Sequence, residues 1–232
     1  MSIGQIKRQR GFTILEAVIV VTIILVLAGM TAPKMLQFSD NEKLRESAQS
    51  YATLLEVARM RATSDNQYYE VLTTTSGLKM AYVDINKSGL LDTETSGAAE
   101  PSIQLPSQLT VTDSGAPITG SGFDTTHNLG IIPLDLGNSP MLDPSGNALP
   151  GLAFNERGLP CQRIKDPVTH VLNPNCKNST WANVTGTAGP TLVAWVTYLK
   201  YRNYNGSTSW AAVTVTPAGR IKTWTHNSGS WQ

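Results

Sequence analysis

An apolar run near the N-terminus constrains this chain more than any other feature. Residues 12–32 are mostly Ile, Val, Leu and Ala, and they follow the basic residues Lys7, Arg8 and Arg10. About 21 residues at 1.5 Å each span a hydrocarbon core of roughly 30 Å. The run predicts a retained membrane helix, because a cleaved secretory signal has a shorter apolar core and an Ala-x-Ala exit. The basic flank predicts a cytoplasmic N-terminus and export of everything after Pro33.

Glu16 is the exception within this run. A carboxylate at the centre of a bilayer costs on the order of 2.5 to 3.5 kcal/mol, and less near the interface. An acid in a membrane helix is expected to pair with a cation, but residues 12–32 contain no Lys, Arg or His. We therefore expect the partner of Glu16 to come from elsewhere.

The segment that contains Glu16 points to a known family. The order Gly11-Phe12-Thr13-Ile14-Leu15-Glu16, after a basic leader and before the apolar run, resembles the N-terminus of type IV pilins and of the pseudopilins of type II secretion. The resemblance implies that prepilin peptidase cleaves between Gly11 and Phe12 and that Phe12 is N-methylated. It also implies that Glu16 pairs with the N-terminal amine of a neighbouring subunit. The alternative is a single-pass anchor with an incidental Glu.

Residues 34–66 have the periodicity of an amphipathic helix. Apolar residues recur every three or four positions, which predicts a stripe that packs under a sheet. Pro33 is expected to kink the helix or to open it locally, and the capping residues 39–41 predict a break. The stripe consists of Leu44, Ala48, Tyr51, Leu55, Ala58 and Ala62.

Residues 67–232 read as a β-rich head. Short runs rich in Val, Thr, Tyr and Trp alternate with Gly, Pro, Asn and Ser, which is typical of antiparallel strands. Residues 113–150 are expected to be a surface insertion, because so long a polar connection is unusual in a compact domain. The predicted strands lie at 68–74, 78–85, 108–113, 151–155, 191–199, 210–216 and 219–225.

Together these segments predict an α+β fold. A long N-terminal helix, transmembrane in its first half and amphipathic in its second, packs on a mainly antiparallel β-sheet head, as the pilin resemblance also implies. The predicted parts are a leader at 1–11, a transmembrane and assembly helix at 12–33, the amphipathic helix at 34–66 and the head at 67–232.

Two further matches narrow the resemblance. The residues Leu54, Leu55, Ala58, Arg59 and Ala62 are similar to the helix of minor pilins and pseudopilins of the GspH/FimT type, which points to a low-abundance subunit. Residues 210–224 are similar to the C-terminal hairpin of the same type, with a turn at 217–219.

The hairpin also raises the possibility of DNA binding. Some GspH/FimT-like proteins bind DNA through Gly-Arg-x-Arg, and this chain has Gly219-Arg220-Ile221-Lys222. Arg220 and Lys222 are two apart on a strand and so share a face that suits phosphates. Lys in place of the second Arg loses the bidentate fork, and a solvated strand face is the alternative. Further cations predicted to widen the basic patch are Lys200, Arg202 and His226. Tyr201 and Tyr204 lie between them in the sequence and are predicted to stack on bases.

The two cysteines, Cys161 and Cys176, are predicted to form a disulfide if the head is exported to an oxidising compartment. A loop of about 15 residues would contribute roughly 3 kcal/mol. Two free thiols in a reducing compartment are the alternative, and no other Cys or His stands at ligand spacing for a metal.

No motif indicates an enzyme, a cofactor or a metal site. The net charge of +1 excludes a global attraction to nucleic acid, and loss of the basic leader would leave about −2. The three histidines are scattered, and no HExxH, GxSxG or P-loop pattern occurs. Residues 84–92 resemble part of a Ca²⁺ loop, but Thr95 stands where the bidentate Glu is required, so a hairpin turn explains them equally well.

These observations predict a minor pilin that serves in the biogenesis of a type IV pilus. We expect it in the bacterial inner membrane with a periplasmic head, and then in the filament. Its expected partners are prepilin peptidase, other pilin subunits, the inner-membrane assembly platform and membrane lipid. The alternatives are a pseudopilin of a type II secretion system and a DNA-binding minor pilin for DNA uptake in natural transformation.

Overall fold

A computed structural model describes most of the helix and the larger part of the two main sheets. The chain forms two units, Met1–Ser39 and Asp40–Gln232, and its longest element is the 52-residue helix α1, Ile14–Asp65. The described residues are 13–74, 79–86, 99–112, 114–117, 130–133, 141–142, 148–149, 151–161, 181–182, 191–227 and 229–232.

The first unit consists, in its described part, of the apolar portion of α1. Its large apolar side chains from Ile14 to Met30 are exposed, and its most apolar 18 residues have a mean hydropathy of 2.6. By length and composition this helix can cross a membrane. The hydroxyls of Thr22 and Thr31 donate to carbonyl oxygens four residues earlier, at 2.7 and 3.1 Å. Satisfying polar groups within the helix is the condition that lipid imposes.

Helix α1 is neither opened at position 33 nor broken at residues 39–41, the two places where the sequence predicts an opening or a break. It runs through position 33 and through residues 39–41 without interruption. Asp40 does not cap a new helix, because its carboxylate accepts hydrogen bonds from the Tyr201 hydroxyl at 3.4 Å and from the Tyr204 backbone N–H at 2.9 Å. A carboxylate satisfied by a distant segment does not compete for the backbone N–H groups of its own helix.

The first sheet of the second unit has five antiparallel strands in the order β3-β2-β1-β8-β9. Val71 of β1 lies opposite Val83 of β2 and Leu152 of β8, so the centre of the sheet is apolar. The strands are β1 Tyr69–Thr73, β2 Met80–Asp84, β3 Ser102–Gln104, β8 Gly151–Phe154 and β9 Pro160–Cys161.

The second sheet is built around its longest strand, β11. The order is β10-β11-β12-β13-β14, and β4 and β5 also pair with β11. The β5–β11 pairing is parallel and the others are antiparallel. The strands are β4 Leu109–Val111, β5 Gly130–Pro133, β10 Trp181–Ala182, β11 Thr191–Arg202, β12 Thr208–Val215, β13 Ile221–Asn227 and β14 Ser230–Trp231.

Residues 113–150 are not simply the surface insertion that the sequence predicts. Its residues 130–133 form β5, which joins the second sheet beside β11. It also holds a separate two-stranded sheet, β6 Met141–Leu142 and β7 Ala148–Leu149. The other residues of this stretch lie outside the described part, apart from 114–117.

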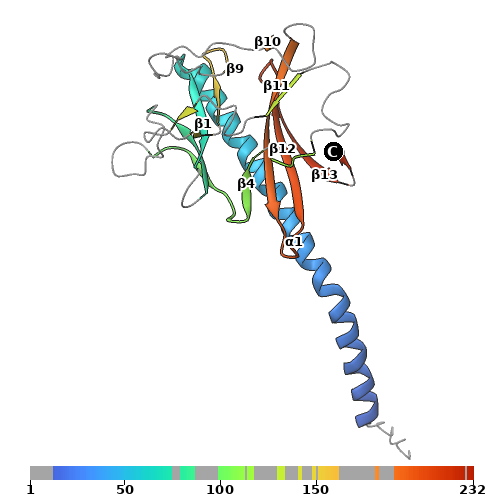
Figure 1. Ribbon diagram of the computed structural model, residues 1–232. Coiled ribbons are helices and arrows are strands. Elements are labelled where there is room, and N and C mark those ends of the chain that lie inside the picture. The colour runs from blue at the N-terminus through green and yellow to red at the C-terminus, as the bar shows by residue number, and fades with distance from the viewer. Residues whose placement is uncertain are drawn as a thin grey trace, which may run out of the picture. The chain divides into compact units, whose positions relative to one another are not determined.

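The core of the second unit lies between α1 and the two sheets. Figure 1 shows strands of both sheets beside the C-terminal part of α1. The predicted helical stripe is confirmed, since all six of its residues are at most 3% exposed. It packs with Trp195, Leu199 and Tyr201 from β11 and with Val71 and Phe154 from the first sheet. The α+β class, with one long N-terminal helix followed by mainly antiparallel sheets, is confirmed.

Candidate functional site

Both faces of the second sheet bury apolar side chains, and one of them also carries cations. Because side chains alternate along a strand, Trp195, Leu199 and Tyr201 of β11 enter the core, whereas Lys200 and Arg202 lie on the opposite side. We call that side the outer face, and it comprises Val196, Tyr198, Lys200 and Arg202 of β11, Trp210, Ala212 and Thr214 of β12, and Lys222, Trp224 and His226 of β13.

The prediction that both Tyr201 and Tyr204 lie among the cations is wrong for Tyr201. Tyr201 does not lie on the outer face: the side chain is buried in the core beside Asp40. Burial, and then the Asp40 carboxylate, raise the pKa of the Tyr201 hydroxyl. Tyr204 is exposed, in the turn between β11 and β12. Only one of the two tyrosines predicted to interleave the cations is therefore accessible.

Two lysines of the outer face lie over tryptophan rings. The Lys222 ammonium is 3.6 Å from the ring centroid of Trp224, and the Lys200 ammonium is 5.3 Å from that of Trp210. A further hydrogen bond, from the Trp224 indole to the Thr214 hydroxyl at 2.9 Å, fixes the ring. Contacts of this kind contribute about 0.5 to 1 kcal/mol at exposed sites and restrain the ammonium.

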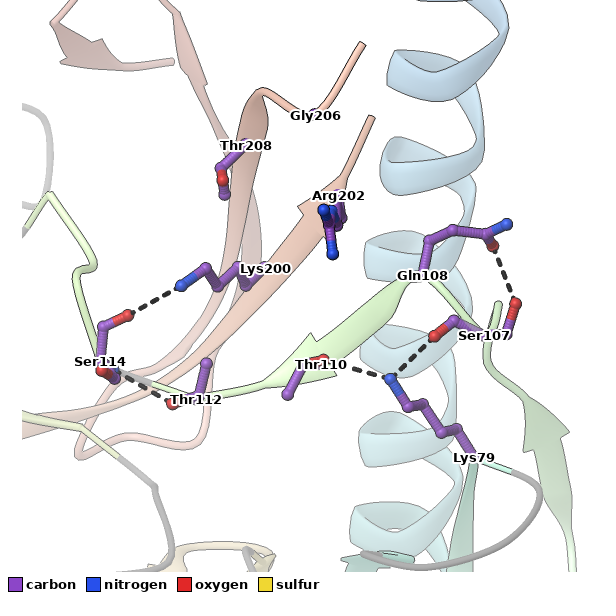
Figure 2. A pocket seen from close by; sticks show the side chains of 10 residues that line it. All are labelled: Lys79, Ser107, Gln108, Thr110, Thr112, Ser114, Lys200, Arg202, Gly206 and Thr208. Atoms are coloured by element: carbon purple, nitrogen blue, oxygen red, sulfur yellow. Dashed lines mark hydrogen bonds between the residues drawn. The ribbon is translucent and has the colours of Figure 1, made fainter. Parts of the chain in front are cut away.

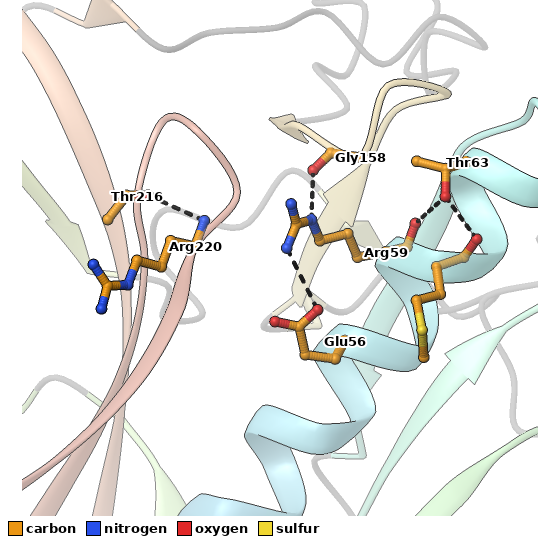
Figure 3. A network of polar contacts seen from close by, with 7 residues as sticks. Glu56, Arg59, Thr63, Gly158, Thr216 and Arg220 are labelled. Carbon is orange, nitrogen blue, oxygen red and sulfur yellow. Dashed lines mark hydrogen bonds and ion pairs between the residues drawn. The ribbon is translucent and has the colours of Figure 1, made fainter.

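Gly219 occupies the turn between β12 and β13, where three segments meet. Its φ is +80°, and a Cβ there would lie 2.5 Å from the carbonyl oxygen of Gly158. That oxygen accepts a hydrogen bond from the Nε of Arg59 on α1 at 3.2 Å, and Arg59 also pairs with Glu56 at 3.5 Å. The glycine of the predicted motif therefore has a structural role in packing the turn (Figure 3).

Arg220 follows this turn and is exposed. Its backbone N–H donates to the Thr216 hydroxyl at 3.1 Å, and in Figure 3 its side chain extends away from Arg59. Lys222, two residues later, is also exposed. The hairpin predicted for this region is confirmed, with β12 and β13 paired from Val215 and Ile221 onward.

A groove of about 680 Å³ lies along the other edge of β11, where β4 pairs with it. Figure 2 shows Lys200 and Arg202 extending from β11, with Lys79 approaching from the far side of β4. The described residues around the groove include three cations and no carboxylate. They are Lys79, Ser107, Gln108, Thr110, Thr112, Ser114, Lys200, Arg202, Gly206 and Thr208.

The structure does not bring the two groups of cations together. Lys222 lies opposite Thr214, which lies opposite Val196, four residues from Lys200. With about 4.8 Å between strands and about 3.3 Å per residue, Lys222 and Lys200 are roughly 16 Å apart. They nevertheless share a face without acidic side chains, because residues 167–232 contain five Lys and Arg residues and no Asp or Glu.

The N-terminal site is described in part. Gly11 and Phe12 lie outside the described residues, and Glu16 is exposed in the first turn of α1. The Thr13 hydroxyl accepts a hydrogen bond from the Glu16 backbone N–H at 3.3 Å. This is half of a capping box, which the spacing Thr-x-x-Glu already indicates in the sequence. In the described part of the chain the Glu16 carboxylate has no ion-pair partner.

The remaining predicted sites are only partly described. Cys161 is fully buried on β9, and Cys176 lies outside the described residues, so their pairing stays a prediction. In the partial Ca²⁺ loop, Asp84 is buried at the end of β2, and residues 87–98 are outside the described part. The Ile85 N–H there donates to Glu100 at 2.8 Å. Across the described residues, no group of three His, Cys, Asp or Glu side chains is placed to hold a metal.

Comparison with known proteins finds a match at the N-terminus of the chain. Residues 6–32 match the family described as the prokaryotic N-terminal methylation motif. No curated protein and no solved structure matches the chain. The match supports a place among type IV pilin-like proteins and pseudopilins, and it covers residues 6–11 of the predicted leader and the whole apolar run with Glu16.

Proposed function

We propose that this chain is a minor pilin, a structural subunit that serves in the biogenesis of a type IV pilus. Prepilin peptidase cleaves it between Gly11 and Phe12 and methylates Phe12. The subunit waits in the bacterial inner membrane with its head in the periplasm, and an assembly platform passes it to a filament of other pilins.

The observation that carries this proposal is the match of residues 6–32 to the methylation motif, joined to the state of Glu16. Glu16 is exposed on a helix whose apolar side chains are also exposed, and no described cation pairs with it. A lone carboxylate in lipid is unfavourable, so a cation from a neighbour stabilises it. The amine created by cleavage before Phe12 supplies that cation when subunits pack.

The cleavage site is tested by Gly11→Val in the producing cell. We expect this variant to remain the longer precursor on a gel and to be absent from filaments, whereas wild type loses eleven residues. Gly4→Val, a glycine change elsewhere in the leader, is the matched control and should be processed normally. Processing of Gly11→Val at the wild-type site would refute the assignment.

The pairing of Glu16 requires a separate test. Glu16→Gln keeps the shape of the side chain but removes its charge, so we expect normal cleavage and loss of assembly. Assembly of Glu16→Gln at the wild-type level would show that the charge has no role. The same cells distinguish the pilus from a type II secretion machine: deletion of the gene removes surface filaments in the first case and blocks export of secreted proteins in the second.

A second candidate function is DNA binding during natural transformation. The observation that favours it is the start of β13, where Lys222 is exposed on the outer face and Arg220 is exposed just before the strand, and the described strands of this sheet carry no Asp or Glu. Lys222 is held over Trp224, which places its charge beside an aromatic surface. Cations in such an array neutralise phosphates, and binding of this kind weakens with salt.

A gel-shift titration of the full chain in detergent micelles with duplex DNA tests this candidate. The double variant Arg220→Gln and Lys222→Gln should weaken the shift at every sequence and lower the salt slope by about 2. Arg45→Gln, at an exposed position of α1 away from the Gly219 turn, should leave the shift unchanged. Absence of any shift at low salt would eliminate DNA as a ligand of this face.

A further inference from the structure

The groove beside β4 and β11 has threonine hydroxyls next to its cations, and these hydroxyls come from two different strands. Thr110 of β4 lies opposite Lys200, and Thr208 of β12 lies opposite Arg202. Lys200 and Arg202 are two apart on β11, so about 6.6 Å separates them along the strand. Two cations and two hydroxyls therefore lie on one face, with one hydroxyl beside each cation.

Lys79 is part of the wall of this groove rather than a free cation. Its ammonium donates to the carbonyl oxygens of Ser107, at 2.8 Å, and Leu109, and to the Thr110 hydroxyl at 3.1 Å. All three of its N–H donors are thereby used. Because the Thr110 oxygen accepts from Lys79, its own proton is left to donate into the groove.

Arg202 and Lys200 retain donors that the described part of the protein does not use. Arg202 is exposed, and no hydrogen bond or ion pair of its guanidinium is found among the described residues, as Figure 2 also shows. Only its backbone N–H is engaged, with the Gln108 carbonyl at 3.1 Å. Lys200 makes one long hydrogen bond, at 3.4 Å to the Ser114 carbonyl.

We propose that this groove binds a phosphate group. The guanidinium of Arg202 presents paired N–H donors, Lys200 adds a second positive charge, and one threonine hydroxyl, Thr110 beside Lys200 or Thr208 beside Arg202, adds a further donor. The oxygens of one phosphate group can accept from both cations and from one such hydroxyl at the same time. The site is separate from the Gly219 turn, and it does not depend on which filament the subunit enters.

Calorimetric titration of the full chain in detergent micelles with sodium phosphate tests the proposal, with sodium chloride at equal ionic strength as the reference. We expect saturable binding that Arg202→Gln weakens by about tenfold, since a charged hydrogen-bond donor is lost. Arg202→Lys should fall between the two, because it keeps the charge without the fork. Arg157→Gln is the matched control and should bind as wild type does.

Two results would overturn the proposal: no saturable phosphate binding by wild type, or equal binding by Arg202→Gln and wild type. Near-ultraviolet circular dichroism of each variant checks that the fold is retained. A second titration with a short single-stranded oligodeoxynucleotide present distinguishes the source of the phosphate. Competition identifies a phosphodiester, and no competition identifies free phosphate. The variant of Arg220 and Lys222 should bind phosphate normally, so failure here is distinguishable from failure of the DNA candidate.

Discussion

Gly219 shows at the scale of a single residue how this head is held together. Its positive φ allows the β12–β13 turn, and its lack of a Cβ lets the turn approach the Gly158 carbonyl that Arg59 binds. Helix α1, the turn after β8 and the turn after β12 meet at this point. The same glycine precedes Arg220, so one residue serves both the fold and the candidate site.

Gly219→Ala is predicted to destabilise the second unit by about 1 to 3 kcal/mol, from backbone strain and from the contact with Gly158. Gly206→Ala is the matched control, because Gly206 has φ +81° and nothing within 4 Å of a built Cβ. The Gly206→Ala variant therefore has the backbone strain of a positive φ without any steric contact. Urea unfolding of both variants measures the difference, and equal losses would show that the close approach is unimportant.

Tyr51 makes the free energy of unfolding depend on pH in the alkaline range. Burial raises its pKa from 10.0 to about 12, and a hydrogen bond with Thr197 partly opposes the shift. The folded state therefore keeps a proton that the unfolded state loses above pH 10. The contribution of this group, about 3 kcal/mol at most, is fully present below pH 10 and is lost as the pH rises through about 12.

Tyr51→Phe is accordingly predicted to reduce the fall in unfolding free energy between pH 9.5 and pH 11.5. At neutral pH the variant should lose about 1 kcal/mol with the hydrogen bond. Urea titrations at both pH values measure the slope. An unchanged slope would mean that Tyr51 is not the group responsible.

At the scale of elements, β11 organises the head. It pairs with β12 from Trp195 to Arg202, with β4 and β5, and with β10 at its start. One face of it builds the core with α1, and the other presents the cations of the outer face. Lys79 ties this sheet to the first one, because it follows the end of β1 and precedes β2 but donates to residues at the start of β4.

Lys79→Met is predicted to cost about 1 to 2 kcal/mol of stability, since hydrogen bonds from a charged donor are lost at a partly exposed site. The spacing between β2 and β4 should also loosen, with faster hydrogen exchange at Leu109 and Leu105. Lys43→Met, at an exposed position of α1, is the control. If both variants unfold at the same urea concentration, the Lys79 contacts do not stabilise the head.

The cysteines give a prediction for β9. We expect Cys161 on this strand to form a disulfide with Cys176 after export, closing a loop worth roughly 3 kcal/mol. Mass spectrometry of unreduced peptides from exported protein should find the two joined. Cys176→Ser should lower the unfolding free energy by a similar amount. Labelling of both thiols by maleimide in denaturant without reductant would contradict the pairing.

How much of these elements could be predicted depends on their composition. The seven strands expected from the sequence all occur, and β4 and β8 are only three and four residues long, because their residues are of types enriched in strands and lie between turn residues. The strands β3, β5, β9, β10 and β14 are two to four residues long and have no period of their own. They form because their backbone hydrogen-bonds to a neighbouring strand, and the local sequence does not predict which strand will be the neighbour.

At the scale of the whole molecule, the second unit contains its own core. Its buried stripe begins at Leu44, and Asp40 at its start accepts hydrogen bonds from Tyr201 and Tyr204. The apolar part of α1 contributes no buried residue among those described before Asp40. The division at Ser39 and Asp40 thus separates an anchor from a head that carries its own stabilising contacts.

A chain shortened to residues 40–232 is therefore predicted to fold without detergent and to unfold in one cooperative thermal transition. A chain shortened further, to residues 49–232, loses Asp40, Leu44 and Ala48 and should melt at a lower temperature. Differential scanning calorimetry of the two measures this. Aggregation of the 40–232 chain, or equal melting temperatures for both, would show that the boundary is misplaced.

The amino-acid sequence by itself determined the membrane-length helix, the capping and charge pattern around Glu16, the helical stripe and the long strands. Each of these depends on residues near one another in the chain. Only the tertiary structure decided which cations are available. It buried Tyr201 against Asp40, engaged Lys79 in hydrogen bonds that join two sheets, and placed Arg202 opposite Thr208 of β12 and Lys200 opposite Thr110 of β4. Those contacts join segments up to about 160 residues apart, and such pairing follows from the packing of whole sheets rather than from local periodicity.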